Sequence, residues 1–467
     1  MTSKRTHILL ILFLGCVLII PHQALAKDNQ LNTYTVFLKR PNYQEEWIKT
    51  LEKRDMKLEY AVEEIGLYEV KAEREKFEAI IEDLNYVESY NESVSMQPAE
   101  FNSISMKNVI NQGGDNSLWE YQWDMKKSTN NGKIYKITKG SKNTVVGIID
   151  SGIDKNHLDL KDNILSVSNL VPKGGLRGQE PYENGETNNS TDYLGHGTFV
   201  AGQIAANGQM KGIAPEIGIR SYRVFGGKSA DTAWIINAII QAANDDVDVI
   251  NVSLGTFLVK SKRMNSRKPA MDELAEIKAF RKAVAFAHKK GSAIVSSIGN
   301  EGLDLNDKNA VYDYWENNVK QEGSSISGEV ILIPAQLPKV VTVASVGPSG
   351  NRSVFSNYGK NIADIAADGG DNRILNEVGV EKYYSEGLFR QEYILGATPQ
   401  GSYTFSVGTS IAAPKISGAL ALLIDQRQLH DKPDKAIQVL LKNTDRYDDK
   451  DNIGKGVLNI YKALLDK

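Results

Sequence analysis

The chain has 467 residues, 41% of them hydrophobic and 24% charged, and its formal net charge is −3. This length corresponds to two or three domains, or to one large domain with an appendage. The near-balance of charge gives no electrostatic basis for nucleic acid as a partner, and no glycine period, heptad or long polar tract indicates a collagen, coiled-coil or disordered chain. Cys16 is the sole cysteine, which excludes an intrachain disulfide framework and a cluster of thiolate metal ligands.

Residues 1–26 have the three-part order of a secretory signal peptide. A basic start at Lys4 and Arg5 precedes the apolar run 8–20 and the small-residue pattern at 24–26. The run is shorter than the ~20 residues that a membrane-spanning helix needs. We therefore expect a secreted, extracellular product with no membrane segment, no cysteine and a net charge of −5 (−3 less the two bases). A lipoprotein anchored through Cys16 is the alternative.

Residues 27–100 have the pattern of a small α+β domain. Elements are predicted in chain order as a strand at 33–38, a helix at 45–54, a strand at 67–70, a helix at 76–84 and a strand at 86–94. Residues that could perform catalysis do not converge in this unit, so we interpret it as a folding or inhibitory appendage. Residues 101–117 are polar and aperiodic, which predicts a linker.

From residue 118 to 467, short apolar strands alternate with helices. Strands are predicted at 144–149, 247–252, 293–298 and 340–346, and helices at 199–206, 232–244, 271–290 and 410–426. Wholly apolar strands separated by helices are typical of a mainly parallel sheet with helices on both faces, so the expected fold class is α/β, preceded by the small α+β domain. The polar stretches 161–191, 256–270 and 301–328 are expected to be loops at the rim of the sheet.

Four polar residues occupy positions where such a sheet places reactive groups. Asp150 and Asn300 each follow a predicted strand, and sites of open α/β sheets lie at the carboxyl ends of their strands. His196 lies between two glycines, which permit a close approach, and Ser410 begins the predicted buried helix. Each also has a structural interpretation: a turn for Asp150 and Asn300, a hydrogen-bonding role for His196 and a helix cap for Ser410.

Together, Asp150, His196 and Ser410 can supply the orienter, base and nucleophile of a serine hydrolase. Serine is too weakly acidic to attack unaided, so it needs the imidazole as a base, and the imidazole needs the carboxylate to fix its tautomer. The Asn300 amide can donate to a developing oxyanion. The spacing of the histidines does not match zinc ligands. Structural hydrogen bonding is expected for His157, His288 and His430.

Four ordered blocks resemble the subtilisin-like serine proteases. They lie at 145–154, 196–202, 297–302 and 408–414. The resemblance covers about residues 118–467 and implies that Asp150, His196 and Ser410 form the catalytic triad and that Asn300 is the oxyanion donor. It also implies that Ser253, Leu254 and Gly255 form a substrate-binding strand. Residues 355–359 look like another turn of this family.

The N-terminal region adds a second resemblance. Residues 31–95 are similar to the inhibitory, fold-assisting propeptide of the family, so 27–100 is expected to be a propeptide, 101–117 a linker and 118–467 the catalytic domain. The signal peptide, the propeptide and the long insertions look most like the lantibiotic leader-processing peptidases of the epidermin type.

The chain also departs from the family. Asp159 matches a family calcium ligand, but the segment 205–212 looks too short to supply the partners, so no metal site is predicted and structural calcium stays open. The triad itself requires no cofactor. Ile411 replaces the methionine usual after the nucleophile, an apolar exchange of similar volume whose effect should be mild. Residues 461–467 contain no sorting motif or apolar tail, which favours free release.

Three functions remain open. The favoured one is a secreted serine endopeptidase that removes the leader from a lantibiotic precursor by cleavage after Arg, with this peptide and its own propeptide as partners. The second is an extracellular subtilase of broad specificity. The third is a catalytically silent binding scaffold, against which the four filled catalytic positions argue.

Cleavage after Arg needs a carboxylate near Ser253–Gly255 to pair with the guanidinium. The candidates are Glu301, Asp304, Asp307, Asp313, Glu316 and Glu322. A basic run, which predicts either a solvated loop or a patch for an acidic leader, contains Lys260, Lys262, Arg263, Arg267 and Lys268. No arginine lies between Arg74 and Arg177. Maturation would therefore use a poorer site, such as Lys107 or an uncharged residue, or the pocket is not strict.

Overall fold

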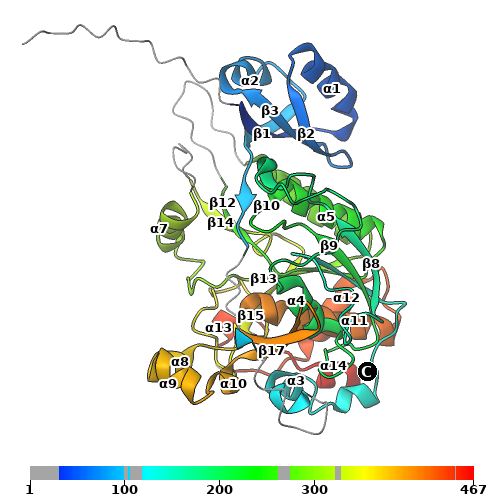
Figure 1. Ribbon diagram of the computed structural model, residues 1–467, viewed down its shortest axis with the longest axis vertical. Coiled ribbons are helices and arrows are strands. Elements are labelled where there is room, and N and C mark those ends of the chain that lie inside the picture. The colour runs from blue at the N-terminus through cyan, green and yellow to red at the C-terminus, as the bar shows by residue number, and fades with distance from the viewer. Residues whose placement is uncertain are drawn as a thin grey trace, which may run out of the picture.

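The computed structural model describes residues 31–98, 104–105, 118–260, 274–320, 328–447 and 449–466. The expected signal peptide and most of the expected linker lie outside these residues. Two units are visible, a small one at the N-terminal end and a large one that contains the long parallel sheet (Figure 1). No helix in the part of the chain described is long and apolar enough to cross a membrane.

The N-terminal unit is an antiparallel sheet with strand order β2-β3-β1-β4 and two helices on one face. Its elements are β1 (Leu31–Leu38), α1 (Gln44–Lys53), β2 (Lys57–Val62), β3 (Leu67–Glu73), α2 (Arg74–Ile81) and β4 (Val87–Glu92). The helices pack through Trp47 and Phe77, and Phe77 stacks on Tyr34 of β1 at 4.0 Å between ring centroids. The sequence did not predict β2. It is an edge strand whose first three residues, Lys57, Leu58 and Glu59, are exposed, so its sequence shows no apolar face.

The large unit is built on a seven-stranded sheet of order β16-β15-β13-β11-β7-β9-β8, and every neighbouring pair is parallel. The strands are β7 (Val145–Asp150), β8 (Ile164–Asn169), β9 (Gly218–Arg223), β11 (Val249–Val252), β13 (Ala293–Ser297), β15 (Val340–Val346) and β16 (Ile365–Asp368). This confirms the predicted parallel α/β sheet.

Helices cover both faces of this sheet. The covering helices are α4 (His196–Ala205), α11 (Thr409–Arg427), α12 (Pro433–Lys442) and α14 (Ile460–Leu465) on one face and α5 (Thr232–Asn244) and α6 (Ala275–Lys289) on the other. Alternate residues of β7 divide between the two cores: Val146 and Ile148 face α4 and α11, whereas Val145 and Ile149 face α5 and α6. Residues 409–424 of α11 are all buried, as its apolar sequence predicts.

The three stretches expected to be loops contain regular structure. Within 161–191, β8 is an edge strand whose half-exposed residues lack the apolar run of a central strand. Residues 256–270 begin with β12 (Thr256–Val259), which pairs antiparallel with β14 (Val330–Ile333). Within 301–328, Asp307 caps α7 (Lys308–Asn318), which buries Val311 and Trp315, four residues apart on one face.

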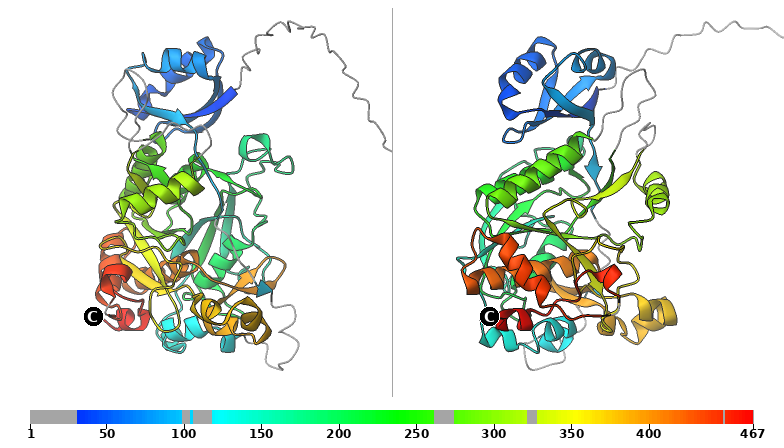
Figure 2. Two further views of the ribbon diagram at one scale, coloured as in Figure 1. Left: turned by 90° about the vertical axis from the view of Figure 1, so that its left-hand side faces the viewer. Right: turned by 180° about the vertical axis from the view of Figure 1, so that it is seen from behind.

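Short strands join the N-terminal region to the large unit. The strand β5 (Ser95–Met96) pairs with β10 (Ala230–Asp231). The strand β6 (Ile104–Ser105) pairs with β18 (Ser402–Ser406), which forms a hairpin with β17 (Ile394–Thr398). The small unit lies over α5 and α6, as all the views show (Figures 1 and 2). The remaining α-helices are α3 (Trp123–Ser128), α8 (Arg373–Val378), α9 (Val380–Ser385), α10 (Phe389–Glu392) and α13 (Lys450–Ile453).

Candidate active site

Three elements bring Asp150, His196 and Ser410 together. Asp150 is the last residue of β7, His196 the first of α4, and Ser410 the second of α11. His196 Nδ1 lies 2.8 Å from Asp150 Oδ1, and His196 Nε2 lies 3.0 Å from Ser410 Oγ. All three residues are buried. The histidine is thus hydrogen-bonded to the acid on one side and to the hydroxyl on the other.

The glycines beside His196 permit this close packing. Gly195, the N-cap of α4, has φ 75°, a left-handed conformation that favours glycine. At Gly197, a Cβ atom would lie 2.1 Å from the carbonyl oxygen of Gly152, so any side chain would push α4 away from the turn that follows Asp150. The glycine-flanked histidine therefore reflects a real steric requirement.

The environment of His196 favours its protonated form. Burial alone would lower the pKa of the imidazole, but the charge of Asp150, the hydrogen bond to it and the charge of Asp192 together raise the pKa above its usual value. A histidine that holds a proton in this way is suited to accept one from Ser410 and to keep it while a negative charge develops nearby.

Asn300 lies beside the hydroxyl of Ser410. Its Oδ1 accepts hydrogen bonds from the Thr409 backbone N–H at 2.8 Å and from the Thr409 hydroxyl at 2.9 Å. A Cβ atom at Gly408 would lie 3.1 Å from Ser410 Oγ and 3.6 Å from Asn300 Nδ2, so both groups border the same small space. Because Oδ1 is fixed by Thr409, the orientation of the amide leaves Nδ2 as a donor towards that space.

Asp192 was not predicted from the sequence, yet it organises the site. Its carboxylate accepts hydrogen bonds from the Ser151 hydroxyl at 2.7 Å, from Gly195 N at 2.8 Å, and from Thr198 N at 2.8 Å and Thr198 Oγ1 at 2.6 Å. Ser151 Oγ also lies 3.2 Å from Asp150 Oδ1, and the Ser151 backbone N–H donates to the same oxygen at 2.8 Å. Asp192 therefore links the start of α4 to the end of β7. Its only sequence signal was an acid shortly before a Gly-His-Gly-Thr segment.

The expected substrate-binding residues Ser253–Gly255 follow β11 and lie next to the loop that contains Asn300. The Leu332 side chain lies between the two segments: a Cβ atom at Gly255 would lie 3.4 Å from its Cδ1 methyl group, and one at Gly299 would lie 3.4 Å from its Cδ2 methyl group. A Cβ atom at Gly299 would also lie 2.5 Å from Glu301 Oε2. Glu301 is thus the candidate carboxylate that lies beside Gly299.

Burial raises the pKa of Glu301, opposed by the hydrogen bond from Asn357 Nδ2. The other candidate carboxylates are engaged or placed elsewhere. Asp307 caps α7, Glu316 pairs with Lys320, and Asp304 accepts from the Asn306 backbone. Asp313 lies within α7, and Glu322 lies outside the described residues.

Of the basic run at 260–268, only Lys260 lies in the described part, where it pairs with Glu329 at 3.5 Å. The other histidines have structural partners: His157 accepts from Asp159 N, His288 pairs with Asp434 and His430 with Asp248.

Asp159 is occupied by protein groups. It accepts from the backbone N–H groups of Gln209 and Met210 and from the Tyr403 hydroxyl, at 2.9 to 3.0 Å. Among the residues that the structure describes, no group of three or more His, Cys, Asp or Glu side chains is placed to hold a metal ion.

Residues 95–105, which we call the connector, pair with the large unit at both ends. Its residues 95–96 pair with β10, where Thr232 donates to the Val94 carbonyl, and its residues 104–105 pair with β18, which ends four residues before Ser410. Both described ends of the connector are thus paired with the large unit, the second of them on the strand that precedes Ser410.

Comparisons with known proteins place this geometry in a family. A family model described as the subtilase family, Peptidase S8, matches residues 141–461. The chain is 38% identical over 422 residues to the epidermin leader peptide-processing serine protease EpiP of Staphylococcus epidermidis, covering 90% of each chain. It is 35% identical over 378 residues to the nisin leader peptide-processing serine protease NisP of Lactococcus lactis subsp. lactis, covering 81% of this chain and 53% of that protein.

A crystal structure of EpiP from Staphylococcus aureus superposes with a TM-score of 0.82 at 37% identity, over 94% of this chain and 99% of that one. The structure of NisP from Lactococcus lactis gives a TM-score of 0.69 at 36% identity, over 75% of this chain and 95% of that one. The predicted family is therefore confirmed: this chain belongs to the subtilase family of serine proteases and is closely related to the lantibiotic leader peptide-processing members.

Proposed function

We propose that the chain is a secreted endopeptidase that removes the leader from a lantibiotic precursor by cleavage after an arginine. The observation that carries the proposal is the hydrogen-bonded series Asp150–His196–Ser410 with the Asn300 amide beside it. The two relatives whose printed names describe leader processing support the choice of substrate.

In this mechanism Ser410 Oγ attacks the scissile carbonyl and His196 Nε2 takes its proton, which it later gives to the leaving amine. Asp150 holds Nδ1 of the imidazole and stabilises the cation that forms. Asn300 Nδ2 donates to the oxygen that becomes negative, a contact worth ~2.7–4 kcal/mol in such sites. Because Thr409 holds Asn300 Oδ1, little reorganisation is needed when that charge appears.

Glu301 is proposed to pair with the arginine of the substrate. It lies beside Gly299, next to Asn300 and near the segment Ser253–Gly255 that is expected to bind the substrate. Burial makes its ionised form unfavourable in the absence of a cationic partner. A guanidinium would offset this cost by a charge-assisted, bidentate contact that a neutral side chain cannot make.

The N-terminal unit is proposed to be a propeptide that the enzyme removes itself. The pairing of the connector with β10 and with β18, the strand that precedes Ser410, supports this role because it holds the uncut chain against the large unit close to the proposed nucleophile. Secretion is inferred from the signal-like pattern of residues 1–26.

A fluorophosphonate probe tests the proposed nucleophile, because it reacts with serines that an adjacent base activates. We expect labelling of the matured protein at Ser410, identified by mass spectrometry of its peptides. Ser410→Ala and His196→Ala should lose the label, whereas Ser385→Ala, on the distant helix α9, should keep it. A label on another serine, or undiminished labelling of Ser410→Ala, would overturn the assignment.

A further inference from the structure

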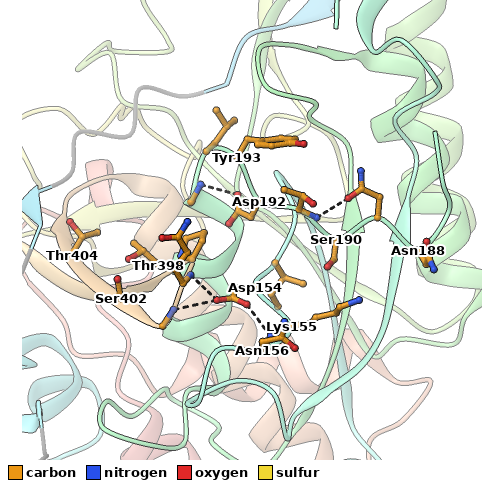
Figure 3. A pocket seen from close by; sticks show the side chains of 18 of the residues that line it. Asp154, Lys155, Asn156, Asn188, Ser190, Asp192, Tyr193, Thr398, Ser402 and Thr404 are labelled. Atoms are coloured by element: carbon orange, nitrogen blue, oxygen red, sulfur yellow. Dashed lines mark hydrogen bonds between the residues drawn. The ribbon is translucent and has the colours of Figure 1, made fainter. Parts of the chain in front are cut away.

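A polar cavity of about 1260 Å³ is lined by residues that follow Asp150 and precede His196 in the chain, and Figure 3 shows side chains of its lining. Its walls are the turn at 153–156 after β7, the loop 184–195 before α4, and the tip of the β17–β18 hairpin at 398–404. Asp154 links the hairpin to the turn, because its Oδ2 accepts hydrogen bonds from the backbone N–H groups of Gln400 at 2.9 Å and Gly401 at 3.4 Å. We call this cavity the hairpin pocket.

The hairpin pocket adjoins the catalytic centre. Leu194 and Gly195 of its wall directly precede His196, and Ser402 and Thr404 of β18 line it as well. The neighbours of these two on β18, Tyr403 and Phe405, are buried in the core, so Ser402 and Thr404 lie on the opposite face of the strand. This face of β18 carries hydroxyl groups towards the pocket (Figure 3).

The connector indicates which part of a substrate would reach this pocket. Its residues 95 and 96 pair with β10, and its residues Ile104 and Ser105, later in the chain, pair with Phe405 and Thr404 of β18. A substrate that pairs with these two strands in the same order places the residues before its scissile bond near β10. The residues after the scissile bond then run along β18, next to the hairpin pocket.

The size of the pocket suits several residues. Sites for drug-sized ligands are about 300–1,000 Å³, so a volume of about 1260 Å³ exceeds the need of one side chain. Its lining is rich in amides that can donate and accept hydrogen bonds: Asn156, Asn184, Asn188, Asn189 and Gln400. Thr404 is 3% exposed, and its hydroxyl has no hydrogen-bond partner among the described residues. A peptide with unpaired backbone and side-chain polar groups matches such a lining.

The charges of the pocket disfavour an acidic occupant. Three carboxylates and one ammonium line it, namely Asp154, Glu186, Asp192 and Lys155. Asp154 and Asp192 already accept hydrogen bonds from the protein on both oxygens. Neither carboxylate needs a further donor, but both contribute negative potential. A segment with carboxylates would meet repulsion there, whereas a neutral or basic segment would not.

We propose that the hairpin pocket binds the residues that follow the scissile bond of the substrate, as a compact, polar segment free of carboxylates. The proposal rests on the proposed peptidase function, since it assigns the pocket to the released part of the same substrate. Under this proposal, the enzyme selects its substrate by the residues after the scissile bond as well as by the arginine before it.

Peptides that differ only after the scissile bond test this assignment with the matured, full enzyme. All share the same residues up to the arginine; one ends shortly after the cut, one continues with Ser, Asn, Gly and Lys, and one continues with Asp and Glu. We expect kcat/KM to be about tenfold higher for the long polar peptide than for the short one, about 1.4 kcal/mol. The acidic extension should lose most of that gain.

Two adjacent loop residues provide a matched pair of variants. Asn188 and Thr187 are both exposed, but only Asn188 lines the pocket. Asn188→Trp should lower kcat/KM for the long polar peptide towards that of the short one and leave the short peptide unaffected, whereas Thr187→Trp should change neither. Equal cleavage of all three peptides, or equal effects of the two variants, would overturn the pocket assignment and leave the peptidase function intact. Failure to cut any of them after arginine would instead overturn the proposed function and the pocket with it.

Discussion

Replacement of Glu69 by Gln is expected to weaken a pH dependence in the attachment of the N-terminal unit to the protease unit. Glu69 on β3 is 4% exposed, and its Oε1 has no hydrogen-bond partner among the described residues. It lies within interaction range of two buried acids of the protease unit, Asp231 at the start of α5 and Glu276 at the start of α6. Glu276 accepts hydrogen bonds from Asn91 Nδ2 at 2.7 Å and Val94 N at 3.3 Å, both from the N-terminal region.

Burial raises the pKa of all three carboxyls. For Glu69 the charge of Asp231 and a hydrogen bond shared with it act in the same direction, whereas Arg177 opposes the effect at Asp231. Tyr60 also faces this cluster, and burial holds its pKa well above the usual value, so it stays neutral. The interface thus favours the protonated form of its acids.

The sign of the effect follows from these raised values. The pKa of Glu276 rises from 4.5 to about 6, so attachment is favoured below about pH 4.5 and weakens as the pH rises towards about 6. For this residue alone the loss is about 2 kcal/mol, since one pKa unit corresponds to about 1.4 kcal/mol. Glu69 and Asp231 act in the same direction. Neutral pH would therefore promote release of the N-terminal unit.

Hydrogen exchange of the Ser410→Ala precursor measures this free energy directly. The amides of β3 and β4 should open with a free energy at least about 1 kcal/mol lower at about pH 7.5 than at about pH 5, after correction for intrinsic exchange, because at pH 5 part of the effect of Glu276 is already lost. Glu69→Gln keeps the side-chain size and can donate to Asp231, so its difference should be smaller. Glu73→Gln, on the same strand but paired at the surface with Lys76, should behave like the parent. An opening free energy that is flat or rises with pH would refute the reasoning.

Three further predictions concern the catalytic centre. Asn300→Ala should lower kcat by ~10²–10³ with little change in KM, because the lost contact forms mainly in the transition state; near-normal turnover would assign the oxyanion to another group. Asp192→Asn should lower the pKa of His196, seen as a shift of the acidic limb of the kcat/KM–pH profile to lower pH, because it removes a charge that raises this pKa; an unmoved limb would leave Asp192 a structural role only. Ser410→Ala should accumulate as a precursor that retains its N-terminal unit on a gel, whereas normal trimming of the purified variant would exclude self-processing.

Four of the five inner strands of the parallel sheet could be predicted from their apolar sequences; β9, which carries Arg220 and Arg223, was missed. β7, β11, β13 and β15 are covered on both faces, so almost every residue is apolar or small. The edge strands β8 and β2 are half-exposed and carry no such run, so they were missed. The strands β12 and β14 have only four residues each and lie beside polar stretches, so the sequence pattern did not identify them as strands.

The triad could be predicted for a different reason. Each member carries a local signature, namely an acid at a strand end, a histidine between glycines and a serine at a helix start. Asp192 carries little local signal, since its role depends on four hydrogen bonds that only folding brings together. The choice of Glu301 among six carboxylates likewise needed the position of Leu332 and the two glycines that face it.

Mass spectrometry of a leader-like peptide tests the central claim most directly. The enzyme should cut after the arginine, and replacement of that arginine by glutamine should slow cleavage at least about tenfold, or about 1.4 kcal/mol. Glu301→Gln should erase most of the difference between the two peptides, because it removes the carboxylate proposed to pair with the guanidinium. Equal cleavage of the arginine and glutamine peptides by the unaltered enzyme would contradict the leader-peptidase account and favour a subtilase of broad specificity.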